Sequence, residues 1–256
     1  MGCTDQILMN YGVDYDKVTP SEIEDYDLVV LEPEQYTVSE VSELAKTDTR
    51  IIGYISMSEV NPHRWYYPLL REIGFLGVNE NWNSPYIDLS SPKARSILLD
   101  EVARSIMAKG FDGLLLDTID GVAPYTERSH LQDEMLGMIR TLNERYPEAY
   151  IIQNRGLFLL QDTDPLVDAI MIEDIATHYD FETENYNLRS VQDYRETVRW
   201  MRSFADTLGK PVLILDYAVE EDMKREVIQR LDTLNQPYYI SNIQLDTLEQ
   251  VYQYRK

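Results

Sequence analysis

The chain has 256 residues, a length typical of one (β/α)8 barrel, which takes about 250 residues. Hydrophobic residues make up 44% of it, which is enough for a large core and argues against a disordered chain. The formal net charge of −22 excludes nucleic acid as the expected partner, because a phosphate backbone is bound by clustered Lys and Arg, and it favours a cationic partner. The alternative is that the surplus acids only keep the protein in solution.

The N-terminal residues bear on location. No apolar run approaches the ~18 residues of a membrane-spanning helix, so the sequence predicts no transmembrane segment. Cys3 is the only cysteine, which excludes an internal disulfide. The start Met1-Gly2-Cys3 is similar to the end of a bacterial lipoprotein signal, although an ordinary chain start reads the same way. We expect a secreted or cell-envelope protein, with a cytoplasmic one as the alternative, and we expect a monomer.

Short apolar runs rich in β-branched residues recur along the chain, and most end at a polar or aromatic residue. Continuous apolar runs are typical of parallel strands that are buried on both faces. The eight predicted strands are Ile7–Tyr11, Asp27–Glu32, Arg50–Ser56, Phe111–Asp117, Tyr150–Asn154, Ala169–Glu173, Val212–Asp216 and Tyr238–Asn242.

Helical patterns lie between several of these runs. Apolar residues repeat at spacings of three and four, as an amphipathic helix requires. The predicted helices are Pro92–Lys109, Ser129–Tyr146, Tyr186–Leu208, Val219–Leu234 and Asp246–Tyr254. The longest excursion without such a pattern, Met57–Ser91, is rich in Trp and Tyr, and loops of that length are more often functional than idle.

The alternation of strands and helices predicts a single (β/α)8 TIM barrel over residues 1–256, in the α/β class. An open parallel sheet has the same alternation. The first strand is not followed by Gly-x-Gly-x-x-Gly, and the sequence has no Walker loop, so a nucleotide-binding sheet lacks its usual signature.

In such barrels the active site lies at the carboxyl ends of the strands. Glycosidases use two carboxyl groups there, one to protonate the leaving oxygen and one as nucleophile or base. A single strand-end acid is more often a helix cap or an Arg partner, so only the acids taken together indicate a site. The residues read from the ends of these runs are Tyr11, Glu32, Tyr54, Ser56, Asp117, Asn154, Glu173, Asp216 and Tyr217.

Other chemistries have less support. None of the three histidines, His63, His130 and His178, ends a predicted strand, which argues against a multi-histidine metal centre. The sequence has no Gly-x-Ser-x-Gly elbow and no lysine at a strand end. We therefore expect neither a metal nor a cofactor.

Four motifs carry a resemblance to a known family. The runs GYISMSE at 53–59 and GFDGLLLDTID at 110–120, with Gln153-Asn154 and Leu215-Asp216-Tyr217, resemble glycoside hydrolase family 114, the endo-α-1,4-polygalactosaminidases. The resemblance implies a (β/α)8 barrel with Asp117 and Glu173 as the catalytic pair. It also implies substrate contacts, at Tyr54, Glu59, Asp120, Asn154 and Asp216. The sequence departs from the family pattern at Ser58 and Arg155.

The expected function is thus a glycoside hydrolase that cleaves α-linked galactosamine-containing polysaccharide, endo-acting and retaining. By analogy with α-galactosidase barrels, Asp117 would be the nucleophile and Glu173 the acid/base. From their strand-end positions we add Tyr11, Glu32 and Tyr217 to the substrate contacts. A non-catalytic carbohydrate-binding or surface-anchored barrel is the alternative, and a carboxylate-bound metal lyase is a third reading.

Overall fold

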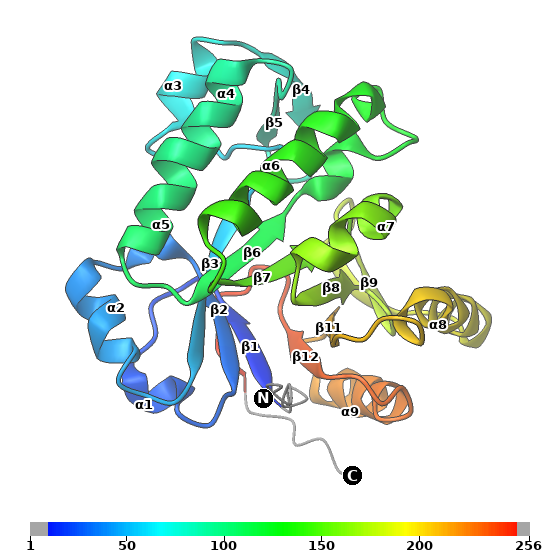
Figure 1. Ribbon diagram of the computed structural model, residues 1–256. Coiled ribbons are helices and arrows are strands. Elements are labelled where there is room, and N and C mark those ends of the chain that lie inside the picture. Colours follow the sequence, from blue (N-terminus) through cyan, green and yellow to red (C-terminus); the bar gives the residue numbers. More distant parts are fainter. Residues whose placement is uncertain (1–9, 250–256) are drawn as a thin grey trace. The chain divides into compact units, whose positions relative to one another are not determined.

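The computed structural model describes residues 10–249. Its eight parallel strands belong to one hydrogen-bonded sheet and alternate with helices (Figure 1), so the predicted (β/α)8 fold is confirmed. The strand order is β1-β2-β3-β6-β7-β8-β11-β12, and β1 also contacts β12. The barrel strands are β1 (Tyr11–Asp14), β2 (Leu28–Leu31), β3 (Arg50–Ser56), β6 (Gly113–Asp117), β7 (Tyr150–Asn154), β8 (Ala169–Glu173), β11 (Val212–Tyr217) and β12 (Tyr238–Ser241).

One predicted strand is displaced. Strand β1 begins at Tyr11 and ends at Asp14, so the placement of Tyr11 at a carboxyl end is wrong. All four residues from Tyr11 to Asp14 are buried and pair with β2, so the polar residue at the carboxyl end of this strand is Asp14. The first residues of the predicted strand, 7–9, lie outside the described residues, as does Cys3.

Helices follow most of the strands. The predicted helix Pro92–Lys109 is confirmed, with a π-helical stretch, Ile97–Ala103 (η2), between its two α-helical ends. The α-helices are α1 (Pro20–Ile23), α2 (Val38–Leu44), α3 (Tyr67–Arg71), α4 (Pro92–Ser96), α5 (Arg104–Ala108), α6 (Gln132–Arg145), α7 (Leu160–Thr163), α8 (Val191–Ala205) and α9 (Glu221–Leu231). The 3-10 turns are η1 (Pro33–Gln35), η3 (Ile119–Val122), η4 (Ser129–Leu131), η5 (Leu157–Leu159) and η6 (Asp164–Leu166).

Two helix predictions need correction. Helix α8 begins at Val191 rather than at Tyr186, because the Ser190 hydroxyl caps it by accepting from the Asp193 amide. Tyr186 instead lies in strand β10 (Asn185–Leu188), which pairs antiparallel with β9 (Thr177–Asp180). The predicted helix Asp246–Tyr254 has no helical residue up to Glu249, and its remainder lies outside the described residues.

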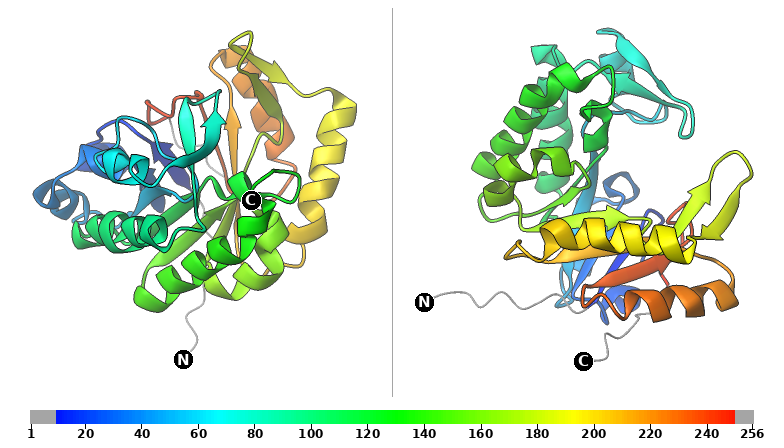
Figure 2. Two further views of the ribbon diagram at one scale, coloured as in Figure 1. Left: turned by 90° about the horizontal axis from the view of Figure 1, so that it is seen from above. Right: turned by 90° about the vertical axis from the view of Figure 1, so that its right-hand side faces the viewer.

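Two antiparallel hairpins extend from the barrel strands (Figure 2). The aromatic excursion forms α3 and the hairpin of β4 (Phe75–Asn79) with β5 (Ser84–Ile87). The β9–β10 hairpin precedes α8 and extends from its N-terminal end. Both hairpins therefore follow the carboxyl end of a barrel strand, where a (β/α)8 enzyme carries its functional loops.

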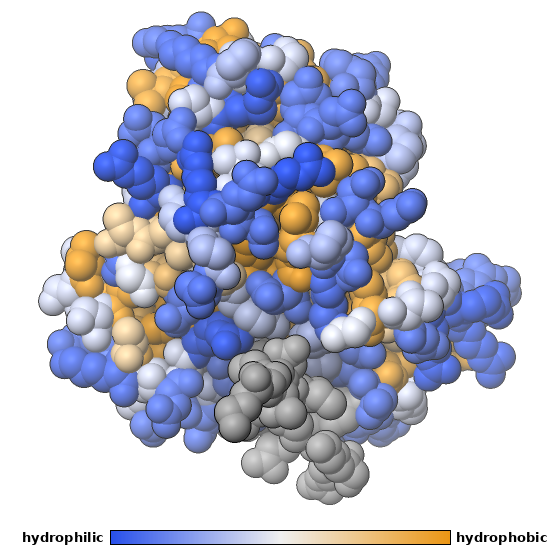
Figure 3. All heavy atoms as spheres, viewed as in Figure 1, coloured by the Kyte–Doolittle hydropathy of each residue, from blue (hydrophilic) through white to orange (hydrophobic). Residues whose placement is uncertain are grey.

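The chain divides into two compact units. Unit 1 consists of Met1–Ile51 and Ala169–Lys256, and unit 2 is Ile52–Asp168. The single domain over residues 1–256 therefore stays a prediction. Among residues 10–249, no helix is long and apolar enough to cross a membrane. Hydrophilic side chains cover much of the face in Figure 3, with apolar ones between them.

Candidate active site

Asp117, at the carboxyl end of β6, is the centre of a hydrogen-bonded group in unit 2. The Tyr54 hydroxyl, from β3, donates to its Oδ2 at 2.9 Å, and Nδ2 of Asn154, at the end of β7, donates to its Oδ1 at 2.8 Å. Three neighbouring strands thus bring three of the predicted site residues together. Two donors stabilise an ionised carboxylate and fix its orientation.

The residue after Asp117 fixes the neighbouring loop. Thr118 has a left-handed backbone (φ 59°), and its Oγ1 accepts hydrogen bonds from the amides of Met57 at 3.1 Å and Ser58 at 3.0 Å. The Ser58 hydroxyl donates to the Thr118 carbonyl in return. A non-glycine residue with positive φ at a site is held there by such surrounding contacts.

The two departures from the family pattern both fit their surroundings. Ser58 has room because Gly121 faces it, and a Cβ on Gly121 would lie 2.1 Å from the Ser58 hydroxyl oxygen. Arg155 and Gly156 both have positive φ, 52° and 62°. The Gly156 amide donates to Oδ1 of Asp120 at 3.0 Å, so Asp120 anchors this turn.

Glu59 is a buried acid of unit 2. Nδ2 of Asn79, in β4, lies 3.2 Å from each of its carboxylate oxygens. Burial raises the pKa of Glu59 from 4.5 to about 7, with a smaller upward contribution from the Asp117 charge, while Asn79 and Arg128 oppose the rise. Arg128 is also stacked over the Tyr86 ring, 3.4 Å from its centroid. A carboxyl with this pKa holds and releases a proton near neutral pH.

Glu173, at the carboxyl end of β8, is the corresponding acid of unit 1. The Tyr217 hydroxyl donates to its Oε2 at 2.7 Å. Tyr217 ends β11, and burial followed by the Glu173 charge raises its pKa well above 10, so it remains a donor. No helix begins directly after Glu173-Asp174, which excludes the helix-cap alternative for this acid.

Asp216 is fully buried and holds backbone. Its carboxylate accepts from the amides of Ile175, Ala176 and Thr177 and from the Thr177 hydroxyl, at 2.6 to 3.2 Å. Burial nevertheless raises the pKa of Asp216 to about 6, although these hydrogen bonds oppose the rise. The segment that follows Glu173 is therefore tied to the core by Asp216.

Tyr11 is buried although it begins its strand. Its ring lies against Tyr239, with ring centroids 5.9 Å apart, and it is 2% exposed. Its hydroxyl oxygen is buried and has no hydrogen-bond partner in the described part of the chain. Burial, then the charges of Asp216 and Glu173, raises its pKa well above 10, so Tyr11 presents a neutral donor near these acids.

Glu32 is the predicted site residue with the plainest local explanation. It is buried, and its carboxylate accepts from the Glu34 amide at 3.1 Å as the N-cap of η1. Capping is the ordinary role of an acid at such a position. Its predicted contact with substrate stays a prediction.

Sequence reasoning missed three further candidate residues. Asp14 escaped notice because the β1 run was ended too early; burial raises its pKa to about 6. Asn79 and Arg128 reach Glu59 from distant parts of the sequence, so no local pattern marks them. The aromatic richness of the Met57–Ser91 segment was the one available signal for Asn79.

Large aromatic side chains of the excursion are exposed. Trp65 and Trp82 are 48% and 42% exposed. Tyr67 stacks on Phe75, with ring centroids 5.4 Å apart. Exposed indole faces are suited to stack on sugar rings and to attract ammonium groups.

Comparisons with known proteins agree with this architecture. The family model of glycoside-hydrolase family GH114 matches residues 6–256. The glycoside hydrolase domain of PelA from Pseudomonas aeruginosa is 24% identical, with a TM-score of 0.82 over 93% of this chain and 96% of that one. Aspergillus fumigatus Ega3, in complex with galactosamine, is 16% identical, with a TM-score of 0.75 over 99% and 98%. An uncharacterized protein from Deinococcus radiodurans is 24% identical over 87% of this chain and 75% of its own length.

Proposed function

Because the chain belongs to glycoside hydrolase family GH114 and is a glycosidase, we propose that it cleaves α-linked galactosamine-containing polysaccharide. The observation that carries this proposal is the placement of Asp117 and Glu173. Each ends a barrel strand, and each carboxylate accepts a hydrogen bond from a tyrosine hydroxyl. Active sites of (β/α)8 enzymes lie at these strand ends.

Asp117 is proposed as the nucleophile of a retaining reaction. Tyr54 and Asn154 orient its two oxygens, which suits an ionised carboxylate that attacks the anomeric carbon. Glu173 donates its proton to the departing glycosidic oxygen as the covalent glycosyl ester forms on Asp117. It then takes a proton from the water that attacks this ester, so that both carboxyls return to their starting states.

The proposed substrate class is a cationic amino-sugar polymer. The net charge of −22 favours a cationic partner, and Ega3 was solved with galactosamine. Glu59 and Asp120 are the acids beside Asp117 that would contact an ammonium or hydroxyl group, and the exposed Trp65 and Trp82 offer stacking faces. Tyr11, Glu32, Asp216 and Tyr217 complete the proposed set of contacts. Because the proposed substrate is a polymer, we propose endo cleavage. We also propose that the protein is a monomer and that it is secreted or held at the cell envelope, where it would encounter extracellular polysaccharide.

The decisive experiment is incubation with de-N-acetylated and N-acetylated galactosamine polymers, followed by mass spectrometry and time-resolved NMR of the products. Release of oligosaccharides whose first-formed anomer is α supports endo cleavage with retention. Initial β products would overturn the nucleophile assignment while leaving a hydrolase. Polymer that is bound but uncleaved by the wild type would favour the non-catalytic alternative.

Two variants test the assigned roles. Asp117→Asn should lower kcat by at least ~10³-fold, because the amide is a poor nucleophile, while polymer binding persists. Glu173→Gln should spare substrates with a good leaving group, such as nitrophenyl glycosides, because these need little protonation. Equal losses on both kinds of substrate would contradict the acid role of Glu173.

Charge should contribute to polymer affinity. Exposed charges are screened beyond about 10 Å at ~0.1 M salt, so raising the salt from low to ~0.5 M should weaken polymer binding. Binding that does not change with salt would remove charge from the account of specificity.

A further inference from the structure

Helix α8 of unit 1 carries a row of arginines. Arg195, Arg199 and Arg202 follow one another at spacings of four and three residues, so they lie on one face over about 10 Å of helix. All three are exposed. A row of three cations on one helix face is unexpected in a chain with 45 acids and 23 bases.

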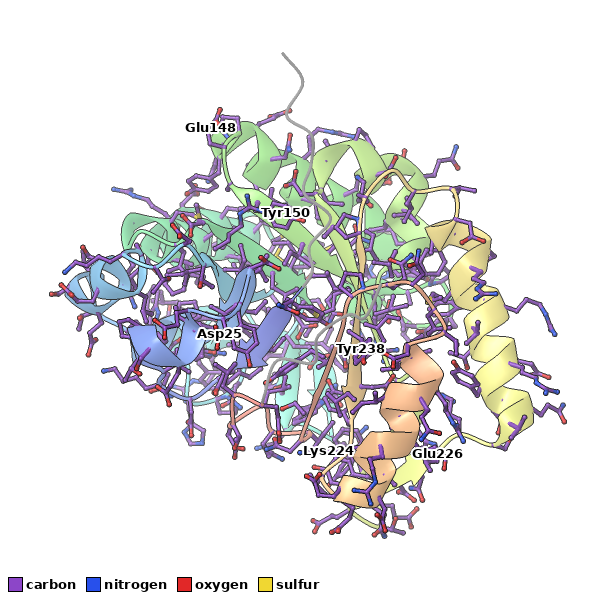
Figure 4. The ribbon with its side chains drawn as sticks, turned by 90° about the horizontal axis from the view of Figure 1, so that it is seen from below. Asp25, Glu148, Tyr150, Lys224, Glu226 and Tyr238 are labelled. Atoms are coloured by element: carbon purple, nitrogen blue, oxygen red, sulfur yellow. The ribbon has the colours of Figure 1, made fainter. Side chains whose placement is uncertain are left out.

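These arginines lack the acidic partners that other arginines of the chain have. Arg145 pairs with Asp100, Arg225 with Asp222, and Arg230 with Glu226, which Figure 4 labels on α9. Within residues 10–249, no ion pair involves Arg195, Arg199 or Arg202.

Among the described residues, the side chains of these arginines make one weak hydrogen bond. Nη2 of Arg202 lies 3.5 Å from the Thr233 carbonyl oxygen. Guanidinium groups that form no ion pair keep most of their donors available to a ligand.

A groove accompanies the row. Helices α8 and α9 lie side by side in Figures 1 and 2, and the Tyr194 hydroxyl joins them by donating to the Arg230 carbonyl at 2.7 Å. The groove has a volume of about 440 Å³. Its lining combines the three arginines with Tyr194, Val198, Thr233 and Leu234.

We propose that this groove binds a multiply charged oxyanion, a phosphate or sulfate group, on Arg195, Arg199 and Arg202. A guanidinium presents its N–H donors as a planar fork that matches two oxygens of such a group. Three forks suit a group, or a short run of groups, with two or more negative charges. The apolar lining of Val198 and Leu234 accommodates the body of an ester that carries the oxyanion.

The chemistry has two sources, a free oxyanion or an ester on a larger molecule. The volume is that of a small-molecule site, of about 300–1,000 Å³, which admits either. The site shares no residue with the Asp117 and Glu173 groups, so it stands whether or not the proposed hydrolysis is correct.

The test is titration calorimetry of the full chain with inorganic pyrophosphate and, separately, with a sulfated oligosaccharide, at constant ionic strength. The double variant Arg199→Gln/Arg202→Gln should lose at least ~10-fold in affinity for the probe that binds. Arg199→Lys should lose less, because it keeps the charge but not the fork. Arg140→Gln, which removes one positive charge at an exposed arginine of α6, is the control and should bind as the wild type does.

Binding of pyrophosphate at least as tight as that of the oligosaccharide identifies a free oxyanion, and the reverse order identifies an ester. The proposal is overturned if neither probe binds the wild type, or if the double variant retains wild-type affinity. An equal loss in Arg140→Gln would also overturn it, because the effect would then be one of net charge. Melting temperatures of all variants establish that each is folded.

Discussion

The Tyr217 hydroxyl donates a hydrogen bond to Oε2 of Glu173 at 2.7 Å, and these two residues end the adjacent parallel strands β11 and β8. Tyr217 is 4% exposed, so its ring cannot rotate away without disturbing the core. One Glu173 oxygen is therefore fixed in position by a rigid donor. Glu173, the proposed acid, therefore needs little reorganisation when substrate binds.

Removing that donor should impair catalysis more than folding. Tyr217→Phe keeps the buried ring but removes this hydrogen-bond donor from Glu173, and we expect kcat to fall about 10-fold. The measurement is steady-state kinetics on galactosamine oligomers. Tyr194→Phe removes a hydroxyl of the same unit that does not contact Glu173, and it should leave kcat unchanged. A Tyr217→Phe enzyme with wild-type kcat would show that the hydrogen bond is only structural.

Substitution of Tyr11 should affect substrate binding but not stability. Its buried hydroxyl has no partner among the described residues, so Tyr11→Phe should leave the melting temperature equal or slightly higher. If substrate satisfies that hydroxyl, the same change should raise KM several-fold. Calorimetry and kinetics on one preparation check both halves. A loss of about 2 kcal/mol in stability would mean that the hydroxyl is satisfied within the folded chain.

Glu59 should make stability depend on pH. Burial, its largest cause, raises the pKa from 4.5 to about 7, so between these values the folded state binds a proton that the unfolded state releases. The contribution of Glu59 to the free energy of unfolding is therefore largest below about pH 4.5. It falls by up to about 3 kcal/mol as the pH rises through 7.

Glu59→Gln should remove this contribution. The variant should be more stable than the wild type at pH 8 and close to it at pH 5, because a neutral amide needs no desolvation of charge. Urea unfolding at four pH values between 5 and 8 measures the difference. A difference that is constant across this range would contradict a raised pKa for Glu59.

Asp216 should prove essential to folding before it affects substrate. Asp216→Asn places an amide NH2 among backbone N–H donors, and we expect a loss of about 2–4 kcal/mol in unfolding free energy. Asp206→Asn, at the exposed C-terminal end of α8, is the control and should change it by less than about 0.5 kcal/mol. Equal effects of the two substitutions would refute the anchoring role.

The barrel was predictable because its signal is local. Strands buried on both faces read as continuous apolar runs, and β3, β7 and β8 have the bounds that the sequence predicts. The error at β1 has the same origin, since Gly12 interrupts the apolar run and the strand continues through it to Asp14. The residues at the strand ends could be predicted because the end of each apolar run is also a local feature of the sequence.

The partners of those residues were not predictable. Which donor reaches Asp117 or Glu59 depends on contacts between distant segments, such as Asn79 of β4 with Glu59. Burial is likewise a property of the folded chain, so the sequence could not show that the Asp216 carboxylate is buried and binds backbone amides. Strand-end position identified candidates, and only the hydrogen bonds distinguish their roles.

The hydrogen bonds between the Asp216 carboxylate and residues 175–177 limit the motion of the segment that follows Glu173. A segment whose amides are bound by a buried carboxylate cannot open and close as a lid without breaking several hydrogen bonds together. Movement of the β9–β10 hairpin must therefore begin beyond Thr177, and Glu173 keeps its place in the empty enzyme. The entropy of ordering this acid is lost during folding, so substrate binding need not supply it.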